Sequence, residues 1–331
     1  MRLNLLEKVR KLALFLRKGI SDVLRPNRFG VSDQYPRHDL WPYGLDYTAK
    51  EMTLHYDITF DPNGIPMMHH NVEQGMSATG KQYYHPLKIA HYALASYNDH
   101  LKEDTVSSAN QFRTSVRYLA KNAELGPQGG VVWRVPRSVS RYGTPCGHVS
   151  AIVQGLVISA LCRSYLLDAN EAHLELAKEA MRVLRVPVEK GGVLADSRWG
   201  SMYEEYPALP YSHVINGFIF CLMGLYDLKS VSESTEAARL FHNGMQTLRA
   251  VIPQWIEASW SKYDLRDVVN GEAKNYATLH YQLLHADQME IMYRVTGEED
   301  FRTQKEKIEK QAENKLFLVN VYVRKVIKFI L

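Results

Sequence analysis

Two glutamates flanked by tyrosines, in the segment Tyr203-Glu204-Glu205-Tyr206-Pro207, form a dense set of proton-handling groups. Carboxyl and phenol groups that line a cleft exchange protons with a bound substrate. An apolar run with helical spacing follows, through Asn216-Gly217-Phe218. The segment also fits an acidic helix start against which the tyrosines pack. The spacing by itself does not choose between these interpretations.

Two later segments carry similar chemistry. One is Tyr263-Asp264-Leu265-Arg266, and the other runs from Asn275 to Gln288. In the second, Tyr281, His285 and Gln288 follow at i, i+4 and i+7 and therefore share a helix face. Since a polar helix face is more often solvated than catalytic, this signal is weak without the other segments.

Several common chemistries lack their motifs in this chain. No glycine-rich dinucleotide or phosphate loop is present, and neither is a serine nucleophile elbow. Cys146-Gly147-His148 and His69-His70 have no partners at ligand spacing, so no metal site is predicted. The remaining chemistry is acid–base catalysis by Glu, Tyr and His, supported by Arg. It needs no redox cofactor.

The composition suits a protein with a sizeable core and an acidic ligand. The chain has 331 residues, of which 46% are apolar, and a net charge of +4, too mild to indicate nucleic acid. Its 20 tyrosines suit stacking on sugars as well as ordinary packing. The three cysteines, Cys146, Cys162 and Cys221, suggest no disulfide framework, which favours a reducing compartment such as the cytoplasm.

Basic amphipathic segments occur near both ends of the sequence. The apolar residues of the first recur at helical spacing: Leu5, Val9, Leu12, Leu16 and Ile20. Lys315 to Leu331 has the same character. The longest apolar run of the first segment, Leu12 to Leu16, is too short for a signal peptide or a transmembrane helix. Both segments fit docking on the protein itself or, alternatively, peripheral contact at the inner face of a membrane.

The pattern along the chain predicts a mainly α fold. Thr53 to Phe60 alternates as a strand does, Asp61 to Gly64 supplies a turn, and Ile65 to His69 returns as a second strand. Helices are expected at Ile89–His100, Ser107–Asn122, Ser150–Asp168, Glu171–Leu184, Ser212–Leu228, Glu233–Val251 and Asn275–Thr296. Such consecutive helices favour an incomplete (α/α) toroid of helical hairpins, with sites in its loops. We expect residues 1–80 to form a helix and small β-hairpin segment, and residues 81–331 the helical catalytic domain.

Taken together, these segments resemble the D-glucuronyl C5-epimerase family, in compact bacterial form. The resemblance covers roughly Gly80 to Thr296 in order. It is carried by Gly80-Lys81-Gln82-Tyr83-Tyr84-His85-Pro86, Ser150-Ala151-Ile152-Val153-Gln154-Gly155, Glu204-Glu205-Tyr206-Pro207 with Asn216-Gly217-Phe218, Tyr263-Asp264-Leu265-Arg266, and Tyr281-x-x-x-His285-x-x-Gln288.

The resemblance implies conversion of D-glucuronate to L-iduronate within a heparosan or N-sulfoheparosan chain, by a homodimer. Its catalytic residues would be Glu205, Tyr206, Tyr263 and Tyr281. Its substrate-binding residues would be Arg266, Tyr84, Arg163, Gln154, Asn216, His285 and Arg134. His85, Lys88, Arg137 and Arg141 are further candidates for contact with an acidic sugar chain. A further N-terminal tyrosine of the family is not placed; Tyr43, Tyr47 and Tyr56 are its candidates.

Removing the C5 proton of a glucuronate needs a base on one ring face, an acid on the other and donors to the carboxylate. We assign Glu205 as base and Tyr281 as acid, with Arg266 paired to the sugar carboxylate; the two faces could be exchanged. Alternatively, Arg266 merely pairs with Asp264 or another acid. Two other functions stay open: a polysaccharide lyase that begins with the same abstraction, and a non-catalytic glycan-binding subunit of capsule synthesis.

Overall fold

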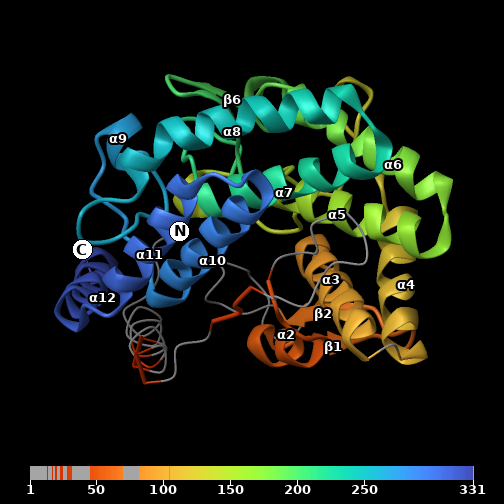
Figure 1. Cartoon of the computed structure of the whole chain (residues 1–331), viewed down its shortest axis with the longest axis horizontal. Helices are drawn as coiled ribbons and strands as arrows, with labels where there is room; N and C mark the ends of the chain where they lie inside the picture. The colour runs from red at the N-terminus through yellow and green to blue at the C-terminus, as the bar shows by residue number, and fades with distance from the viewer. Residues whose placement is uncertain are drawn as a thin grey trace. The chain divides into compact units, whose positions relative to one another are not determined.

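The computed structural model describes residues 45–69, 82–103 and 105–330, together with positions 13, 17, 19, 20, 23, 24 and 28–31. It consists of two compact units. Unit 1 comprises residues 1–31 and 252–331, and unit 2 comprises residues 32–251. Helices dominate both units (Figure 1), as the sequence pattern predicts. The expected division near residue 80 stays a prediction.

Unit 2 is built from successive helices that pack on one another. They are α2 (Ala49–Tyr56), α3 (Pro86–Glu103), α4 (Val106–Lys121), α5 (Ala151–Asp168), α6 (Glu171–Met181), α7 (Ile215–Ser232) and most of α8 (Thr235–Trp255). α3 and α4, in orange, lie side by side in Figure 1, and α5 packs against α3, α6 and α7. Every helix predicted in this part of the chain is present, with slightly shifted ends.

α5 and α7 form the centre of unit 2, and their composition explains this. Both are apolar on nearly all faces, which is typical of a buried helix rather than a surface one. Within the part of the chain that the structure describes, α5 alone has the length and hydropathy of a membrane-crossing helix. However, 78% of it is buried inside the protein, as in a core helix.

Glycines bring the backbones of α5 and α7 into direct contact. A Cβ atom placed on Gly155 would lie 2.5 Å from the Cα atom of Cys221. A Cβ atom on Gly224 would collide with the carbonyl oxygen of Gly155. Because any side chain at these positions would force the helices apart, the close crossing requires glycine on both helices.

The strand predicted from Thr53 to Phe60 is wrong over most of its length. Residues Ala49–Tyr56 form α2, and β1 holds only Thr59–Phe60. The helix starts with a capping box in which Thr48 and Glu51 bond each other's main-chain N–H groups. This local signal outweighs the alternation of side chains.

The second predicted strand and its turn are confirmed. β1 pairs antiparallel with β2 (Pro66–His69), which also pairs with β3 (Gln82–Tyr83). Asp61 holds the turn by accepting hydrogen bonds from the N–H groups of Asn63 and Ile65. Two further hairpins were not predicted. They pair β4 (Glu124–Leu125) with β5 (Val131–Val132), and β6 (Leu194–Ser197) with β7 (Gly200–Tyr203).

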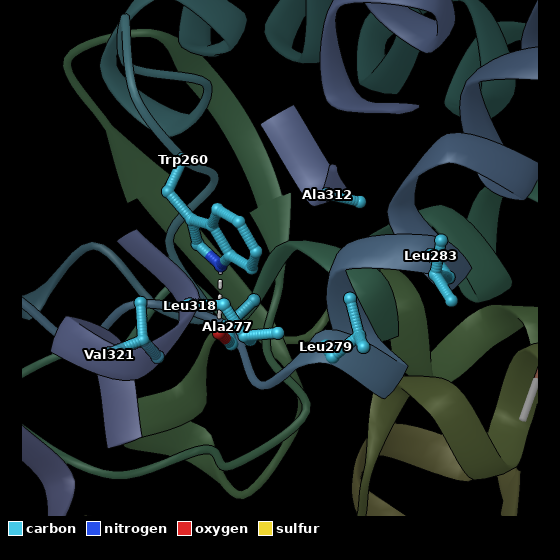
Figure 2. Packing of buried hydrophobic residues seen from close by; sticks show 7 residues of the cluster. All are labelled: Trp260, Ala277, Leu279, Leu283, Ala312, Leu318 and Val321. Atoms are coloured by element: carbon cyan, nitrogen blue, oxygen red, sulfur yellow. Dashed lines mark hydrogen bonds between the residues drawn. The ribbon is translucent and has the colours of Figure 1, made fainter. Parts of the chain in front are cut away.

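Unit 1 contains α9 (Arg266–Asn270), α10 (Leu279–Thr296), α11 (Glu299–Ala312) and α12 (Lys315–Ile330). Its hydrophobic core gathers around Trp260, whose indole Nε1 donates to the carbonyl oxygen of Ala277 at 2.9 Å (Figure 2). Leu279 and Leu283 from α10 and Leu318 from α12 complete much of this core.

The two predicted basic helices have different outcomes. The second is confirmed as α12. Of the first, Leu5, Val9, Leu12 and Leu16 lie outside the described residues, whereas positions 13, 17, 19, 20, 23 and 24 are helical. Gly19 lies against the ring of Tyr322, so the first helix contacts α12 at a residue that has no side chain.

Candidate active site

Glu205 follows β7 directly and is tied to the start of α5. The carbonyl oxygen of Glu204 accepts a hydrogen bond from Ala151 N at 3.0 Å, and that of Glu205 accepts one from Ser150 Oγ at 2.7 Å. The first turn of a helix leaves N–H groups without partners in the helix, and the first of these bonds supplies one. The backbone of Glu205 is therefore fixed by the N-terminus of a core helix.

The carboxyl group of Glu205 is held against the first turn of α7. A Cβ atom on Gly217 would lie 2.5 Å from Glu205 Oε2 and 2.7 Å from its Cβ. Gly217 thus leaves the space that the glutamate side chain fills. Asn216, predicted to bind substrate, is buried beside it in the same turn.

The surroundings of Glu205 adjust its acidity. Burial raises the pKa of the carboxyl group to about 7, and the charge of Glu204 acts in the same direction. A hydrogen bond from Tyr206 and the positive charges of Arg137 and Lys88 favour the ionised form and oppose this rise. A carboxyl group with a pKa near neutrality both accepts and returns a proton readily at physiological pH.

Tyr206 is positioned by an aromatic stack. Its ring lies parallel to that of Tyr142, with centroids 4.3 Å apart and an angle of 6° between the planes. His148 is also near, with its ring centroid 6.4 Å from that of Tyr206. From the sequence, His148 was considered only as a metal ligand. Its place just before the Ser150 helix start is the signal that could have drawn attention to it.

The loop from Trp133 to Val149 contributes Tyr142 to this stack and Arg137 to the charges that act on Glu205. It folds back on itself through the bridges Val135–His148 and Val139–Thr144. His148 Nδ1 lies 2.7 Å from the carbonyl oxygen of Pro145, which can only accept, so this nitrogen carries a proton. Burial lowers the pKa of His148, although the bond to Pro145 opposes this, and Arg137 lowers it further.

The start of α3 adds a second cation beside Glu205. The Nζ atom of Lys88 lies 3.1 Å from the centroid of the Tyr56 ring, a cation–π contact. Burial lowers the pKa of His85 well below its usual value, and the charges of Lys88, Arg137 and His148 lower it further. His85 is therefore neutral, and the positive charge near Glu205 comes from Lys88 and Arg137.

Tyr203 and Glu204 bond other parts of unit 2. Tyr203 is buried, and its hydroxyl donates to the carbonyl oxygen of Leu240 at 3.2 Å. The carboxylate of Glu204 accepts hydrogen bonds from Ser212 Oγ at 2.9 Å and from the main-chain N–H of His213 at 3.2 Å. With its Oε1 atom also 2.5 Å from His213 Nδ1, this carboxylate holds the loop before α7.

Unit 1 carries the other predicted catalytic residues. The rings of Tyr263 and Tyr281 meet edge to face, with centroids 4.7 Å apart. Tyr263 N donates to the carbonyl oxygen of Asn275 at 2.7 Å, which fixes the backbone of this tyrosine. Arg266 forms an ion pair with Glu272 and lies at the start of α9. The structure thus brings both tyrosines together and gives Arg266 the acidic partner Glu272, as in the alternative in which this arginine pairs with Asp264 or another acid.

His285 has a structural environment in unit 1. Its Nδ1 atom lies 2.7 Å from Ser261 Oγ, and its ring meets Trp255 with centroids 4.7 Å apart. Burial lowers the pKa of His285 to about 3, so the ring is neutral at physiological pH. These contacts favour a packing role over the predicted contact with substrate.

Two other predicted ligands in unit 2 lie in the interior. Gln154 accepts from Trp133 N at 3.3 Å and donates to the carbonyl oxygens of Val131 and Ala180. Arg163 forms a buried ion pair with Asp227 at 2.5 Å. Since their polar groups bond other parts of the chain, these positions favour structural roles.

The remaining predicted ligands are exposed. Tyr84 donates its hydroxyl hydrogen to Asp61 Oδ2 at 2.9 Å. Arg134 bonds Glu124 Oε2 at 3.1 Å and the carbonyl oxygen of Gly147 at 3.0 Å. Both side chains stay partly open to solvent and therefore remain candidates for contact with a long substrate.

The three candidate N-terminal tyrosines differ in their surroundings. Tyr43 lies outside the described residues. Tyr47 is buried, with its hydroxyl 2.8 Å from His91 Nδ1. Tyr56 contacts Lys88, one of the cations that act on Glu205. In the described ranges, no three His, Cys, Asp or Glu side chains gather as metal ligands would.

Comparison with known proteins gives a matching family and two relatives. Residues 129–310, more than half of the chain, match the family model of the D-glucuronyl C5-epimerase C-terminus. A D-glucuronyl C5-epimerase of Caenorhabditis elegans is 33% identical over 193 residues, covering 54% of this chain and 31% of that protein. An uncharacterized protein of Methanocaldococcus jannaschii is 28% identical over 173 residues, covering 51% and 54%. The match thus spans about a third and about half of their lengths.

Solved structures share the fold at low identity. An α-1,6-mannanase of glycoside hydrolase family 76 from Salegentibacter is similar with a TM-score of 0.52 and 12% identity, covering 80% of this chain and 68% of that one. A D-mannose isomerase gives a TM-score of 0.52 at 10% identity, covering 84% and 72%. These likenesses confirm the predicted (α/α) helical-hairpin fold and say nothing about substrate.

Proposed function

The chain belongs to the D-glucuronyl C5-epimerase family, and on that premise we propose that it inverts C5 of D-glucuronate units within a heparosan-type polysaccharide. The family supports an epimerase that acts on carbohydrate. The polymer and the roles of single residues are our proposal.

Glu205 is the observation that carries the proposal. The C5 hydrogen of a glucuronate is weakly acidic, so its base must hold a proton strongly yet be ionised at neutral pH. A buried carboxyl group with a pKa of about 7 satisfies both conditions. An ordinary exposed glutamate, with a pKa near 4.5, would be a far weaker base.

The cations around Glu205 suit the charge that develops in the reaction. Loss of the C5 proton places a second negative charge on the substrate carboxylate. Arg137 and Lys88 already act on Glu205 through their charges, and they would favour an anionic sugar in the same place. As the proton passes to Glu205, the carboxyl group becomes neutral and the cations are left to stabilise the substrate anion.

The opposite face of the sugar needs a proton donor. We assign this role to Tyr281, with Tyr263 beside it and Arg266 as a partner of the substrate carboxylate. The edge-to-face contact of the two tyrosines supports a shared role, because each restricts the orientation of the other ring. Binding of a uronate carboxylate by Arg266 would replace its ion pair with Glu272.

The proposal is tested by proton exchange in heavy water. Heparosan in N-acetylated, de-N-acetylated and N-sulfated forms is incubated with the protein, and NMR follows deuterium at C5 and the iduronate signals. We expect both with at least one polymer. The rate should increase about tenfold per pH unit below pH 7 and level off above it, because only ionised Glu205 accepts the proton.

Matched variants separate catalysis from binding. Glu205→Gln should abolish exchange while polymer binding is retained, and Glu175→Gln, a change at an exposed glutamate, should leave exchange unchanged. Unsaturated uronate ends with chain shortening would instead identify a lyase. Binding of polymer without exchange on any form would leave a glycan-binding subunit and refute the epimerase.

A further inference from the structure

An apolar groove lies within unit 1, between the helical positions 19, 20, 23 and 24 and α12. Its volume is about 460 Å³. It is lined by Gly19, Ile20, Val23, Leu24, Val319, Tyr322, Val323, Val326 and Ile327. Among the residues that the structure describes, no charged side chain lines it, so it suits a hydrocarbon chain better than an acidic sugar polymer.

Large apolar side chains of α12 and of the helical positions beside it are exposed. Leu316 is 86% exposed and Leu24 is 74% exposed, and Ile20, Val319, Val323 and Ile327 are each about half exposed or more. Leu316, Val319, Val323 and Ile327 follow at helical spacing and so form one stripe along α12. A contiguous exposed apolar surface of this kind marks a site of contact rather than ordinary surface.

The charged side chains that the structure describes on α12 are positive. Lys315, Arg324 and Arg17 are exposed, and the segment Lys315–Ile330 contains no Asp or Glu. An apolar stripe flanked only by cations on its own helix is the pattern of a helix that lies in the interface of an anionic membrane.

We propose that α12 and the helical positions 19, 20, 23 and 24 dock this protein on the surface of a bilayer that contains anionic phospholipid. The apolar stripe enters the acyl region, the groove takes an acyl chain, and Lys315, Arg324 and Arg17 lie at the headgroups. Charge complementarity favours this occupant over a second copy of the chain, because two copies would bring like charges together. The inference does not depend on the proposed epimerase activity.

Vesicle sedimentation of the whole chain tests the proposal. The probes are vesicles of phosphatidylcholine alone and vesicles that also contain phosphatidylglycerol, each at low and at high salt. The protein should sediment with the anionic vesicles, at least about tenfold more than with the neutral ones, and high salt should weaken this binding.

Variants at exposed positions identify the surface without disturbing the core. Leu316→Gln with Val323→Gln should reduce binding about tenfold. Val106→Gln with Leu125→Gln removes apolar side chains of similar size that are 76% and 81% exposed elsewhere, and should leave binding unchanged. Lys315→Gln with Arg324→Gln should weaken binding to anionic vesicles only.

Three results would overturn the proposal. The first is absence of sedimentation with either kind of vesicle. The second is equal loss of binding in the Val106/Leu125 control. The third is concentration-dependent self-association, measured by analytical ultracentrifugation, that the Leu316/Val323 variant abolishes while vesicles have no effect. That result would assign the face to a second copy of the chain.

Discussion

Replacement of Glu205 by Gln should stabilise the protein even as it abolishes proton exchange. The pKa of this carboxyl group is about 7 in the folded protein, against an ordinary value of 4.5. Since folding raises the pKa, the contribution of Glu205 to stability is fully present below about pH 4.5 and is lost as pH rises through 7. Each pKa unit corresponds to about 1.4 kcal/mol, so ionised Glu205 costs roughly 3 kcal/mol above pH 7.

The assay is urea unfolding of both proteins from pH 5 to pH 9. A glutamine keeps the shape of the glutamate side chain and an oxygen that accepts a hydrogen bond from Tyr206, but it never ionises. The variant should therefore gain stability over the parent with rising pH, by roughly 3 kcal/mol at the alkaline end, and the two should converge toward pH 5.

Glu204→Gln is the matched control, one residue away. Its carboxylate accepts hydrogen bonds from Ser212 and His213 on both oxygens, and an amide offers only one such oxygen. This variant should be destabilised by about 1–3 kcal/mol, because a buried donor loses its partner. A Glu205→Gln protein that is no more stable than the parent at pH 8 would refute the assignment of a desolvated carboxylate with a raised pKa.

Three further outcomes follow from the contacts around the site. Gly217→Ala would displace the Glu205 side chain, because the new Cβ would lie 2.5 Å from Oε2; exchange at C5 should fall about a hundredfold while circular dichroism stays unchanged. Tyr142→Leu removes the stack on Tyr206 and should lower kcat several-fold with little change in stability, measured by steady-state kinetics and thermal melting. Asp227→Ala leaves a buried arginine without its ion-pair partner and should cost about 3–5 kcal/mol in chemical denaturation.

The helices were predictable because the spacing of their apolar residues along the sequence indicates which residues are buried. α5 and α7 follow from long apolar runs, and α10 from its periodicity. The strand over Thr53–Phe60 failed because the Thr48–Glu51 capping box lies upstream of the alternating residues. The β6–β7 hairpin was missed because its four-residue strands are too short to show a period.

The proton-handling core of the site was predictable in part. Glu205 and Tyr206 stand out by residue type, but the groups that tune them come from a distant loop. Nothing local to Tyr142 indicates a stack on Tyr206, since that contact depends on how the loop folds back. Conversely, Gln154 and Arg163 resemble ligands because a polar residue in an apolar helix has the same pattern whether it faces a cleft or the interior.

The glycine contact between α5 and α7 sets a timescale for motion in unit 2. With backbone against backbone at Gly155, no side-chain rotation can loosen the pair, and the helices separate only when the unit unfolds. Their amide hydrogens should exchange with solvent over the longest times. Glu205 is fixed to the first turns of both helices, and its backbone should therefore be equally rigid. The loop from Trp133 to Val149 is held by isolated bridges, so its amide hydrogens, including those of Arg137 and Tyr142, should exchange sooner. The base would thus stay in place while its aromatic and cationic partners admit each new sugar unit.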